Sequence, residues 1–184
     1  RRLEVELDRA VMRQVVADLA AGKVPPGTGV SINLSGPSVV HEQICNWLSE
    51  FRPFQKDYHL MIEITETALI TQIGLANENL SKLRACGFDI ALDDFGSGYS
   101  SVRYLASMPV DVVKFDISLI HALSEPAQRR LVRYLVELIK EAGQQVVAEG
   151  IETEEMLQMV RDVGFGCVQG YLVGRPAMLK PTSR

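Results

Sequence analysis

Apolar residues along this chain alternate between two arrangements, short continuous runs and rows spaced by three or four residues. Short runs rich in branched side chains predict strands, and the spaced rows predict amphipathic helices. The runs that predict strands are GVSINLS (29–35), LMIEIT (60–65), DIALDDF (89–95), VDVVKFD (110–116), QVVAEG (145–150) and CVQGYLV (167–173). Each run is apolar enough to be buried on both faces, which indicates a parallel sheet.

The spaced rows predict helices before and between these strands. In residues 2–21, apolar side chains recur at steps of four from Leu3 to Leu19. A second helix is expected to start at Pro37 and to carry one apolar face as far as Phe51. Further helices are expected over 69–87, around 102–105, over 131–143 and over 153–164. The third of these is lined by Leu131, Tyr134, Leu135, Leu138 and Ile139.

The regular spacing of the strands favours a barrel. Asn33, Glu63 and Asp93 lie 30 residues apart in three successive strands. A (β/α)₈ barrel of about 250 residues averages roughly 31 residues per unit, so a chain of 184 residues holds about six of the eight units. We therefore expect an α/β fold, a TIM-like barrel with about six of its eight β/α units. An open doubly wound sheet is the alternative, but the GxGxxG turn that normally follows its first strand is absent.

Composition and charge exclude several classes of protein. The chain is 47% hydrophobic and 23% charged, which excludes a disordered tail and a disulfide-stapled mini-protein. No apolar run approaches the roughly 18 residues that a membrane helix needs. The net charge of −4, with no basic run, argues against DNA or RNA as a partner. Three widely spaced cysteines indicate reduced thiols and a cytoplasmic protein.

Every predicted strand carries a polar or charged side chain at or near its carboxyl end. These residues are Asn33, Glu63, Asp93, Asp94, Lys114, Asp116, Glu149 and Gln169. The carboxyl ends of parallel barrel strands converge on one mouth, where active sites form. A single strand-end aspartate is often a helix cap or a turn residue, and Lys114 alone fits a core lysine paired with a carboxylate. The whole set at one rim is better explained by a functional site.

The side chains of this set are typical ligands of hard divalent cations. Carboxylate and amide oxygens suit Mg²⁺ or Mn²⁺, and the adjacent Asp93 and Asp94 would repel each other unless a cation neutralised them. Two ions about 4 Å apart can clamp a phosphodiester for attack by water, and Lys114 could orient or help deprotonate that water. The loop DDFGSGYSS is rich in glycine and suggests a mobile gate beside the metals.

At these positions the chain resembles a known family, the EAL domain, which is the bacterial cyclic di-GMP phosphodiesterase. The matching segments are SINLS, EITET, DDFGSGYSS, PVDVVKFD, VAEGIET and QGYLVGRP. They occur in the family's order and cover essentially the whole chain. The resemblance implies a modified TIM barrel, often dimeric, that uses two Mg²⁺ or Mn²⁺ ions to hydrolyse cyclic di-GMP to linear pGpG in signal transduction.

The resemblance also implies a role for individual residues. One metal ion would be held by Asn33, Glu63 and Asp93, and the other by Asp93, Asp94 and Glu149. Lys114 resembles the lysine next to the hydrolytic water, and Glu149 resembles a residue also regarded as a base. The residues that resemble those near the substrate or its waters are Asp116, Glu152, Gln169 and Tyr171. Glu66 resembles the residue that anchors the DDFG loop.

The Glu-Ala-Leu motif that names the family is absent from this sequence. In the family it lies on an early strand, upstream of a helix that resembles residues 2–21, and its glutamate is a metal ligand. We therefore expect residues 1–184 to be an EAL-type phosphodiesterase domain that is incomplete at its N-terminus, with weak or no turnover as a lone monomer. The alternatives are a catalytically inactive regulatory module that binds cyclic di-GMP or dimerises, and another magnesium-dependent barrel enzyme with Lys114 as its base.

The family's partners and locations complete these expectations. The resemblance implies cyclic di-GMP as the ligand and a homodimer as the assembly. Sensor or GGDEF domains are commonly fused upstream in the family, and some full-length members are anchored in a membrane while the domain itself is cytoplasmic.

Overall fold

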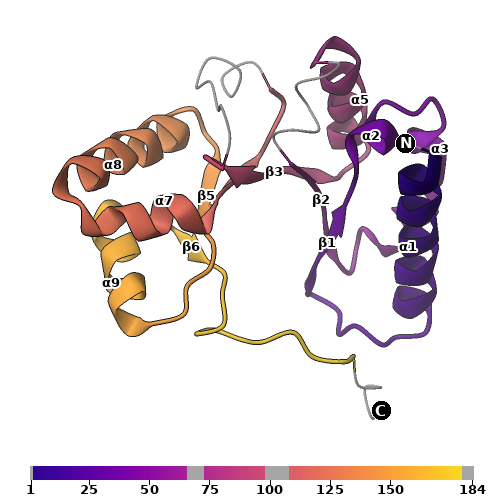
Figure 1. Cartoon of the computed structure of the whole chain (residues 1–184). Coiled ribbons are helices and arrows are strands. Elements are labelled where there is room, and N and C mark those ends of the chain that lie inside the picture. The colour runs from indigo at the N-terminus through magenta and orange to yellow at the C-terminus, as the bar shows by residue number, and fades with distance from the viewer. Residues whose placement is uncertain (1, 66–72, 98–107, 180–184) are drawn as a thin grey trace. The chain divides into compact units, whose positions relative to one another are not determined.

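The computed structural model describes residues 2–65, 73–97 and 108–179. These residues belong to two compact units (Figure 1). The first unit comprises the chain up to Ile90 together with residues 177–184, and the second comprises residues 91–176. The boundary falls inside strand β3, Asp89–Phe95.

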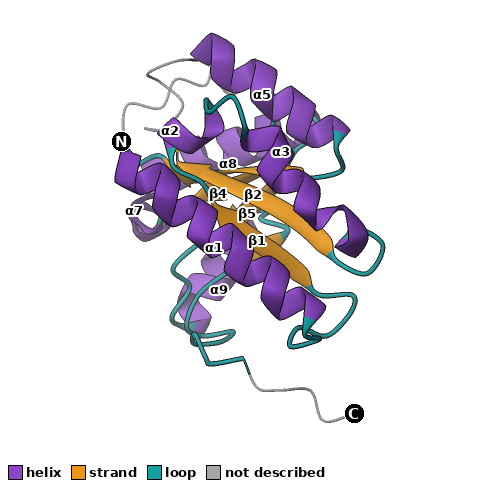
Figure 2. Cartoon of the chain, turned by 90° about the vertical axis from the view of Figure 1, so that its right-hand side faces the viewer, coloured by secondary structure: helices purple, strands orange, loops and turns teal. Residues whose placement is uncertain are grey.

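The first unit is built on two parallel strands covered by helices. Its elements are α1 (Arg2–Ala20), β1 (Gly29–Asn33), α2 (Gly36–Val39), α3 (Ile44–Leu48), η1 (Ser49–Phe54), β2 (His59–Thr65) and α5 (Ile73–Ala85). The strands pair in register from Gly29 opposite His59 to Asn33 opposite Glu63. Figures 1 and 2 show α1 along one face of this pair. Side chains from the strands, η1 and α5 are fully buried between these layers, among them Ile62, Phe51 and Leu80.

The predicted helix from Pro37 to Phe51 is wrong, because the chain breaks it into α2, α3 and the 3₁₀ helix η1. Between α2 and α3 the side chain of His41 accepts a hydrogen bond at Nδ1 from the Gln43 backbone N–H, at 3.2 Å. A side chain that captures a backbone donor in this way competes with the helical hydrogen bonds. In η1, Pro53 has no backbone N–H to donate.

Helix α1 follows its predicted range but presents a different face to the core. Met12 and Leu19 are buried, whereas Leu3, Leu7 and Val11 are exposed to 78%, 64% and 42%. The row of apolar residues at steps of four therefore lies largely on the outer surface of the first unit. Only its end, at Leu19, reaches the core.

The second unit continues the pattern with parallel strands and helices. Its further elements are β4 (Val112–Phe115), α7 (Ile117–His121), η2 (Ala122–Ser124), α8 (Pro126–Glu141), β5 (Gln145–Ala148), α9 (Glu154–Val163) and β6 (Cys167–Val168). Strand β3 pairs with β4, β4 with β5 and β5 with β6, each in parallel. Phe115 packs edge-on against Phe95 and Phe165 at ring distances of 5.1 and 5.0 Å, which anchors the core of this unit.

Helix α9 forms over its predicted range, whereas α8 begins at Pro126, before the range predicted for it. The hydroxyl oxygen of Thr153 caps α9 by accepting the Met156 N–H at 3.2 Å, and Gly164 ends the helix with a φ of +103°, as predicted. Helix α8 buries Val132, Val136 and Ile139. Three of the residues predicted to line it lie on its exposed side instead, namely Leu131, Tyr134 and Leu138.

The fold class expected from the sequence is confirmed. The described residues contain six strands with parallel pairing, and helices separate all of them except β3 and β4. The start of the helix predicted over 69–87 and the whole of the one predicted around 102–105 lie outside the described residues. No helix among those described has both the length and the apolar character to cross a membrane. All three cysteines are free thiols.

Candidate active site

The first unit places two of the predicted ligands at neighbouring strand ends. Asn33 ends β1 directly opposite Glu63 in β2, and the Leu34 N–H donates to the Glu63 carbonyl at 2.9 Å. Asn33 is exposed, whereas Glu63 is only 8% exposed. The parallel register, rather than any local motif, makes these residues neighbours although they lie 30 positions apart in the chain.

A carboxylate of α1 holds the segment that follows Asn33. Oδ2 of Asp8 accepts hydrogen bonds from the Ser35 N–H at 2.8 Å and from the Ser35 and Ser38 hydroxyls at 2.6 Å each. Ser38 is fully buried, so these bonds satisfy polar groups that have little access to water. Sequence reasoning missed Asp8, because no periodic signal links a helix residue to a loop 27 positions later.

The second unit brings three predicted carboxylates into one cluster. Oxygens of Asp93, Asp94 and Glu149 all lie within 4.8 Å of one another. The two aspartates come from the carboxyl end of β3, and Glu149 follows the last residue of β5. The Glu149 N–H donates to the Phe115 carbonyl at 3.1 Å, which ties this residue to the end of β4.

A β-bulge allows both neighbouring aspartates to reach the cluster. Successive side chains of a regular strand point to opposite faces, but the pairing of β3 with β4 shifts between Leu92 and Phe95. Within this interval Asp94 adopts a left-handed backbone conformation with a φ of +56°. A bulge redirects a side chain in this way, and bulges are common beside active sites.

The turn after the bulge has room only for glycine at position 96. Gly96 has a φ of +96°, and a Cβ atom there would collide with the side chain of Leu119 in α7. The Ser97 N–H closes this turn by donating to the Asp94 carbonyl at 3.1 Å. Packing thus fixes the start of the predicted mobile loop, while its remainder from residue 98 to 107 lies outside the described residues.

Lys114 lies between two members of the cluster. Its Nζ is 2.9 Å from Asp93 Oδ1 and 2.8 Å from Glu149 Oε1, and its side chain is only 6% exposed. A buried ammonium group requires such partners, because removing it from water unpaired is strongly unfavourable. Lys114 is therefore fixed at the carboxylates by its ion pairs and belongs to the cluster.

The cluster carries more negative charge than its surroundings stabilise. Burial raises the pKa of Asp94, and the nearby carboxylates of Asp93 and Asp116 raise it further. Burial also raises the pKa of Glu149, although Lys114 opposes this effect. Both carboxyl groups therefore give up their protons less readily than ordinary ones, which is the behaviour expected where like charges are brought together.

These donors fit a divalent cation. Three carboxylates that converge within a few ångströms offer only hard oxygen ligands, as Mg²⁺ and Mn²⁺ prefer. Burial raises the pKa of Asp94 and Glu149 and repulsion between the carboxylates adds to it, and a cation at this point would offset that repulsion. The chemistry predicted from the sequence is therefore compatible with the geometry of the second unit.

Asp116 has a structural role in the second unit. Its carboxylate caps α7 by accepting the Ser118 N–H at 2.9 Å, and its own N–H donates to the Phe95 carbonyl at 3.1 Å. This is the helix-cap explanation considered for a single strand-end aspartate. Its charge still acts on Asp94, so the capping role and closeness to the cluster coexist.

The remaining predicted residues of the second unit follow β5 and β6. The Gln169 N–H donates to the Ala148 carbonyl at 2.8 Å, and the Ile151 N–H donates to the Gln169 carbonyl at 3.0 Å, so Gln169 lies beside Glu149. Tyr171 is 51% exposed, and Glu152 is exposed. Glu66, the predicted anchor of the loop, lies outside the described residues.

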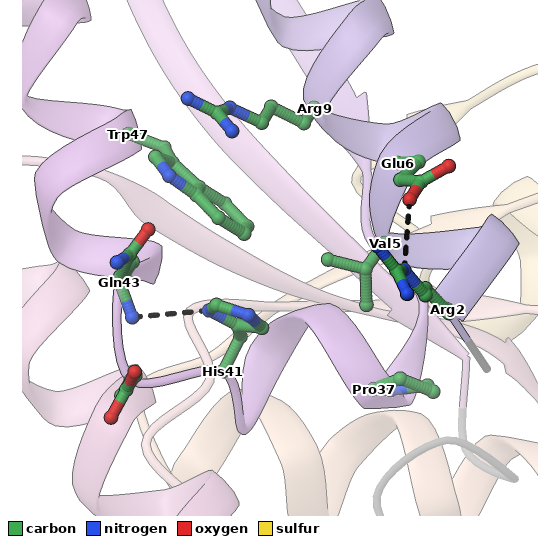
Figure 3. Close-up of a pocket in the computed structure, with 9 residues that line it drawn as sticks. Arg2, Val5, Glu6, Arg9, Pro37, His41, Gln43 and Trp47 are labelled. Carbon is green, nitrogen blue, oxygen red and sulfur yellow. Dashed lines mark hydrogen bonds and ion pairs between the residues drawn. The ribbon is translucent and has the colours of Figure 1, made fainter.

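A pocket of about 580 Å³ lies elsewhere in the first unit, between α1, α2 and α3 (Figure 3). In it the guanidinium of Arg9 lies 5.3 Å from the centre of the Trp47 ring, and His41 stacks on that ring at 4.5 Å. None of the predicted site residues lines this pocket. Its acidic and basic side chains are mixed, and Arg2 is already paired with Glu6, so no single ligand chemistry follows from it.

The chain belongs to the EAL domain family, whose model matches residues 1–176. PdeB of Shewanella oneidensis, named a cyclic di-GMP phosphodiesterase, is 33% identical over 97% of this chain and 21% of its own length. RocR of Pseudomonas aeruginosa, also named a cyclic di-GMP phosphodiesterase, is 37% identical over 77% of this chain and 36% of its own length. PdeG of Escherichia coli, named a probable cyclic di-GMP phosphodiesterase, is 31% identical over 95% of this chain and 35% of its own length. The chain thus spans between about a fifth and a third of the length of these relatives.

Solved structures give the same fold. BlrP1 of Klebsiella pneumoniae, in a complex with manganese and cyclic di-GMP, matches with a TM-score of 0.79 and 30% identity, over 96% of this chain and 45% of its own. The PaMucR phosphodiesterase, in a complex with c-di-GMP, matches with a TM-score of 0.76 and 28% identity. The match covers 95% of this chain and 71% of the PaMucR chain. The chain therefore has the α/β fold of EAL TIM-barrel domains, with six parallel strands among the described residues, in agreement with the six units that the sequence predicted.

Proposed function

We propose that this chain is the catalytic part of a phosphodiesterase that hydrolyses cyclic di-GMP to linear pGpG with the help of two divalent cations. The observation that carries the proposal is the cluster of Asp93, Asp94 and Glu149 around the buried ammonium of Lys114. The relatives named cyclic di-GMP phosphodiesterases support the choice of substrate.

The ligands divide between the two ions. Asn33, Glu63 and Asp93 would hold one ion, and Asp93, Asp94 and Glu149 would hold the other. The bound Mg²⁺ or Mn²⁺ ions would supply positive charge that offsets the phosphodiester and its transition state. The convergence of three carboxylates and the raised pKa of Asp94 and Glu149 support this assignment.

Lys114 and Glu149 act on the attacking water. The ammonium of Lys114 orients the water by a hydrogen bond, and the Glu149 carboxylate accepts its proton. The water oxygen forms a bond to phosphorus as the bond from phosphorus to the 3′-oxygen breaks, and the proton ends on that oxygen. One molecule of cyclic di-GMP and one of water thus give pGpG, with a 5′-phosphate and a free 3′-hydroxyl.

Other predicted residues contact the substrate or its waters. They are Asp116, Glu152, Gln169 and Tyr171. The position of Gln169 beside Glu149 supports its place in this group. We assign to Glu66 the anchoring of the DDFG loop, and we place the domain in the cytoplasm.

We further infer that residues upstream of Arg1 complete the domain and supply the Glu-Ala-Leu motif. The exposed apolar row of Leu3, Leu7 and Val11 on α1 supports this inference, because a helix with apolar residues on two faces normally packs on two partners. The short span of the chain within its relatives agrees with it and leaves room for sensor or GGDEF domains. The intact mass of the natural protein tests it, since a mass of 20.4 kDa would contradict it.

We also propose a homodimer. The exposed apolar residues Leu131, Tyr134 and Leu138 of α8 support this assembly, because a contiguous apolar row on a surface marks an interaction site. Sedimentation of the intact protein is expected to give twice the monomer mass, and Tyr134→Glu is expected to give the monomer. A monomeric wild type over the micromolar range would contradict the dimer.

Hydrolysis by the intact protein, followed by chromatography of the nucleotides, tests the proposed activity. With Mg²⁺ or Mn²⁺ present, cyclic di-GMP is expected to disappear as pGpG forms, and EDTA is expected to stop the reaction. Asp93→Asn is expected to lower kcat at least 100-fold, because it removes the bridging charge. Asp89→Asn is the matched control, since it makes the same change at the exposed opposite end of β3.

The same samples distinguish the alternatives. Binding of cyclic di-GMP without any pGpG would identify a regulatory module and overturn the catalytic proposal. If the protein neither binds nor cleaves cyclic di-GMP, the choice of substrate is overturned.

A further inference from the structure

Tyr171 and Arg175 form a stacked pair after the last strand. The guanidinium carbon of Arg175 lies 4.5 Å from the centre of the Tyr171 ring. Tyr171 is nevertheless 51% exposed. Since a guanidinium group is planar and stacks well on an aromatic face, Arg175 covers one face of the ring and leaves the rest of it open.

The backbone that carries this pair is held firmly. The Leu172 N–H donates to the Ile151 carbonyl at 3.0 Å, and the N–H groups of Val173 and Gly174 both donate to the Gly170 carbonyl at 3.1 Å. Gly170 packs so closely on the backbone of Ile151 that a Cβ atom there would overlap it. Tyr171 is thus an exposed aromatic ring on a fixed support, which limits the entropy lost when a planar ligand stacks on it.

The same segment adjoins the carboxylate cluster. Gln169, two residues before Tyr171, pairs with the backbone on either side of Glu149, through Ala148 and Ile151. The ring therefore belongs to the strand end next to a cluster residue. A nucleotide whose phosphate is bound at the cluster carries its base a few ångströms away, within the reach of such a neighbouring side chain.

We propose that Arg175 is a positioning residue that holds the Tyr171 ring as a one-sided stacking platform for a purine base of the substrate. This inference rests on the proposed function and extends it to the base, since stacking on an aromatic face recognises a base through its π surface. Arg175 acts through Tyr171. Its guanidinium occupies the face opposite to the base and keeps the ring from turning.

A double-mutant cycle in the intact protein tests this role, with kcat and KM measured for cyclic di-GMP. Arg175→Ala is expected to raise KM about tenfold, the size of one weakened base-stacking contact, and to leave kcat within about twofold. Tyr171→Ala is expected to raise KM at least as much. The double variant is expected to match Tyr171→Ala alone, because without the ring there is nothing for Arg175 to position.

A fluorescent probe separates stacking from a general structural effect. A cyclic dinucleotide with 2-aminopurine in place of one guanine loses fluorescence when that base stacks on an aromatic ring. The wild type is expected to quench this fluorescence, Arg175→Ala to quench it less, and Arg175→Lys to recover part of the effect. Arg133→Ala is the matched control, because Arg133 is an exposed arginine of the same unit whose guanidinium donates to the Asp162 carbonyl of α9.

The outcomes are distinct. An unchanged KM and unchanged quenching in Arg175→Ala, with the wild type active, would overturn the inference and leave the proposed function standing. A further rise in KM when Arg175→Ala is added to Tyr171→Ala would also overturn it, since Arg175 would then act independently of the ring. A wild type that neither binds nor cleaves cyclic di-GMP would overturn the proposed function and this inference together.

Discussion

At the scale of single residues, Asp94 shows that the cluster lowers the stability of the folded protein. Among the described residues it is the one non-glycine with a positive φ, a conformation that costs about 1–2 kcal/mol for an ordinary L-residue. Burial also raises the pKa of its carboxyl group, and the carboxylates of Asp93 and Asp116 raise it further. The sequence predicted the chemistry of the Asp93–Asp94 pair. It could not predict the left-handed conformation, because a bulge depends on the pairing of β3 with a strand about 20 residues later.

Asp94→Asn is expected to stabilise the metal-free protein at pH 7, because it removes an unfavourable negative charge. The gain is limited to about 1 kcal/mol, because this charge is partly exposed and screened by solvent. Folding raises the pKa of Asp94, so the folded state holds its proton more tightly than the unfolded chain. Protonation of Asp94 therefore stabilises the folded state fully below the ordinary pKa of 3.8. This stabilisation is lost as the pH rises through the raised pKa of the folded state. Asparagine also tolerates the left-handed conformation.

Urea unfolding in EDTA at pH 7 and near pH 4 measures this effect. The gain in unfolding free energy is expected at pH 7 and is expected to shrink at the lower pH, because the raised pKa favours the neutral form of wild-type Asp94 there. Asp89→Asn, at an exposed position of the same strand, is expected to change little at either pH. An equal gain at both pH values would show that repulsion is not the cause.

At the scale of elements, the sequence predicted where strands and long helices lie better than which helix face is buried. The strand from Asp89 to Phe95 was predicted with its observed bounds, because its apolar run and flanking glycine are local signals. The inward face of α1 was not, because it is set by its contacts with α2, α3 and η1. Asp8 is an example, since its partners Ser35 and Ser38 come from a distant segment.

Asp8→Ala is expected to destabilise the protein by about 2–3 kcal/mol, because it removes a charged acceptor of three hydrogen bonds and leaves a buried hydroxyl poorly satisfied. Unfolding in urea, followed by the fluorescence of the single tryptophan Trp47 in the same unit, measures this loss. Asp18→Ala is the matched control, because Asp18 lies on the same helix but bonds only the exposed side chains of Gln14 and Lys23. Equal losses in the two variants would refute a special role for Asp8.

At the scale of the whole molecule, the fold class followed from the sequence because it depends on repetition. Six apolar runs separated by helical rows admit few arrangements other than parallel strands with helices between them. The division into two compact units was not predicted, because its boundary lies inside β3 and no linker or change of composition marks it. The predicted site residues divide with it, since Asn33 and Glu63 belong to the first unit and Asp93, Asp94, Lys114 and Glu149 to the second.

Divalent cations are expected to stabilise the molecule because they bind the folded state selectively. Adding millimolar Mn²⁺ or Mg²⁺ to the EDTA-treated protein is expected to raise Tm by several degrees, as measured by calorimetry. Asp93→Asn is expected to abolish most of this shift, measured from its own Tm in EDTA, whereas Asp89→Asn is expected to retain it. A shift of the same size in Asp93→Asn would place the stabilising ion elsewhere.

Gly96 and Gly170 differ in how the protein can tolerate their mutation over evolutionary time. At Gly96 a new side chain would meet the side chain of Leu119, so a second mutation that trims Leu119 can relieve the overlap. At Gly170 the obstacle is the backbone of Ile151, which no exchange of side chains removes. A compensating change can thus relieve the overlap at position 96, but the φ of +96° still strains any L side chain there. A lost Gly170 has no such partner and can be restored only by reversion.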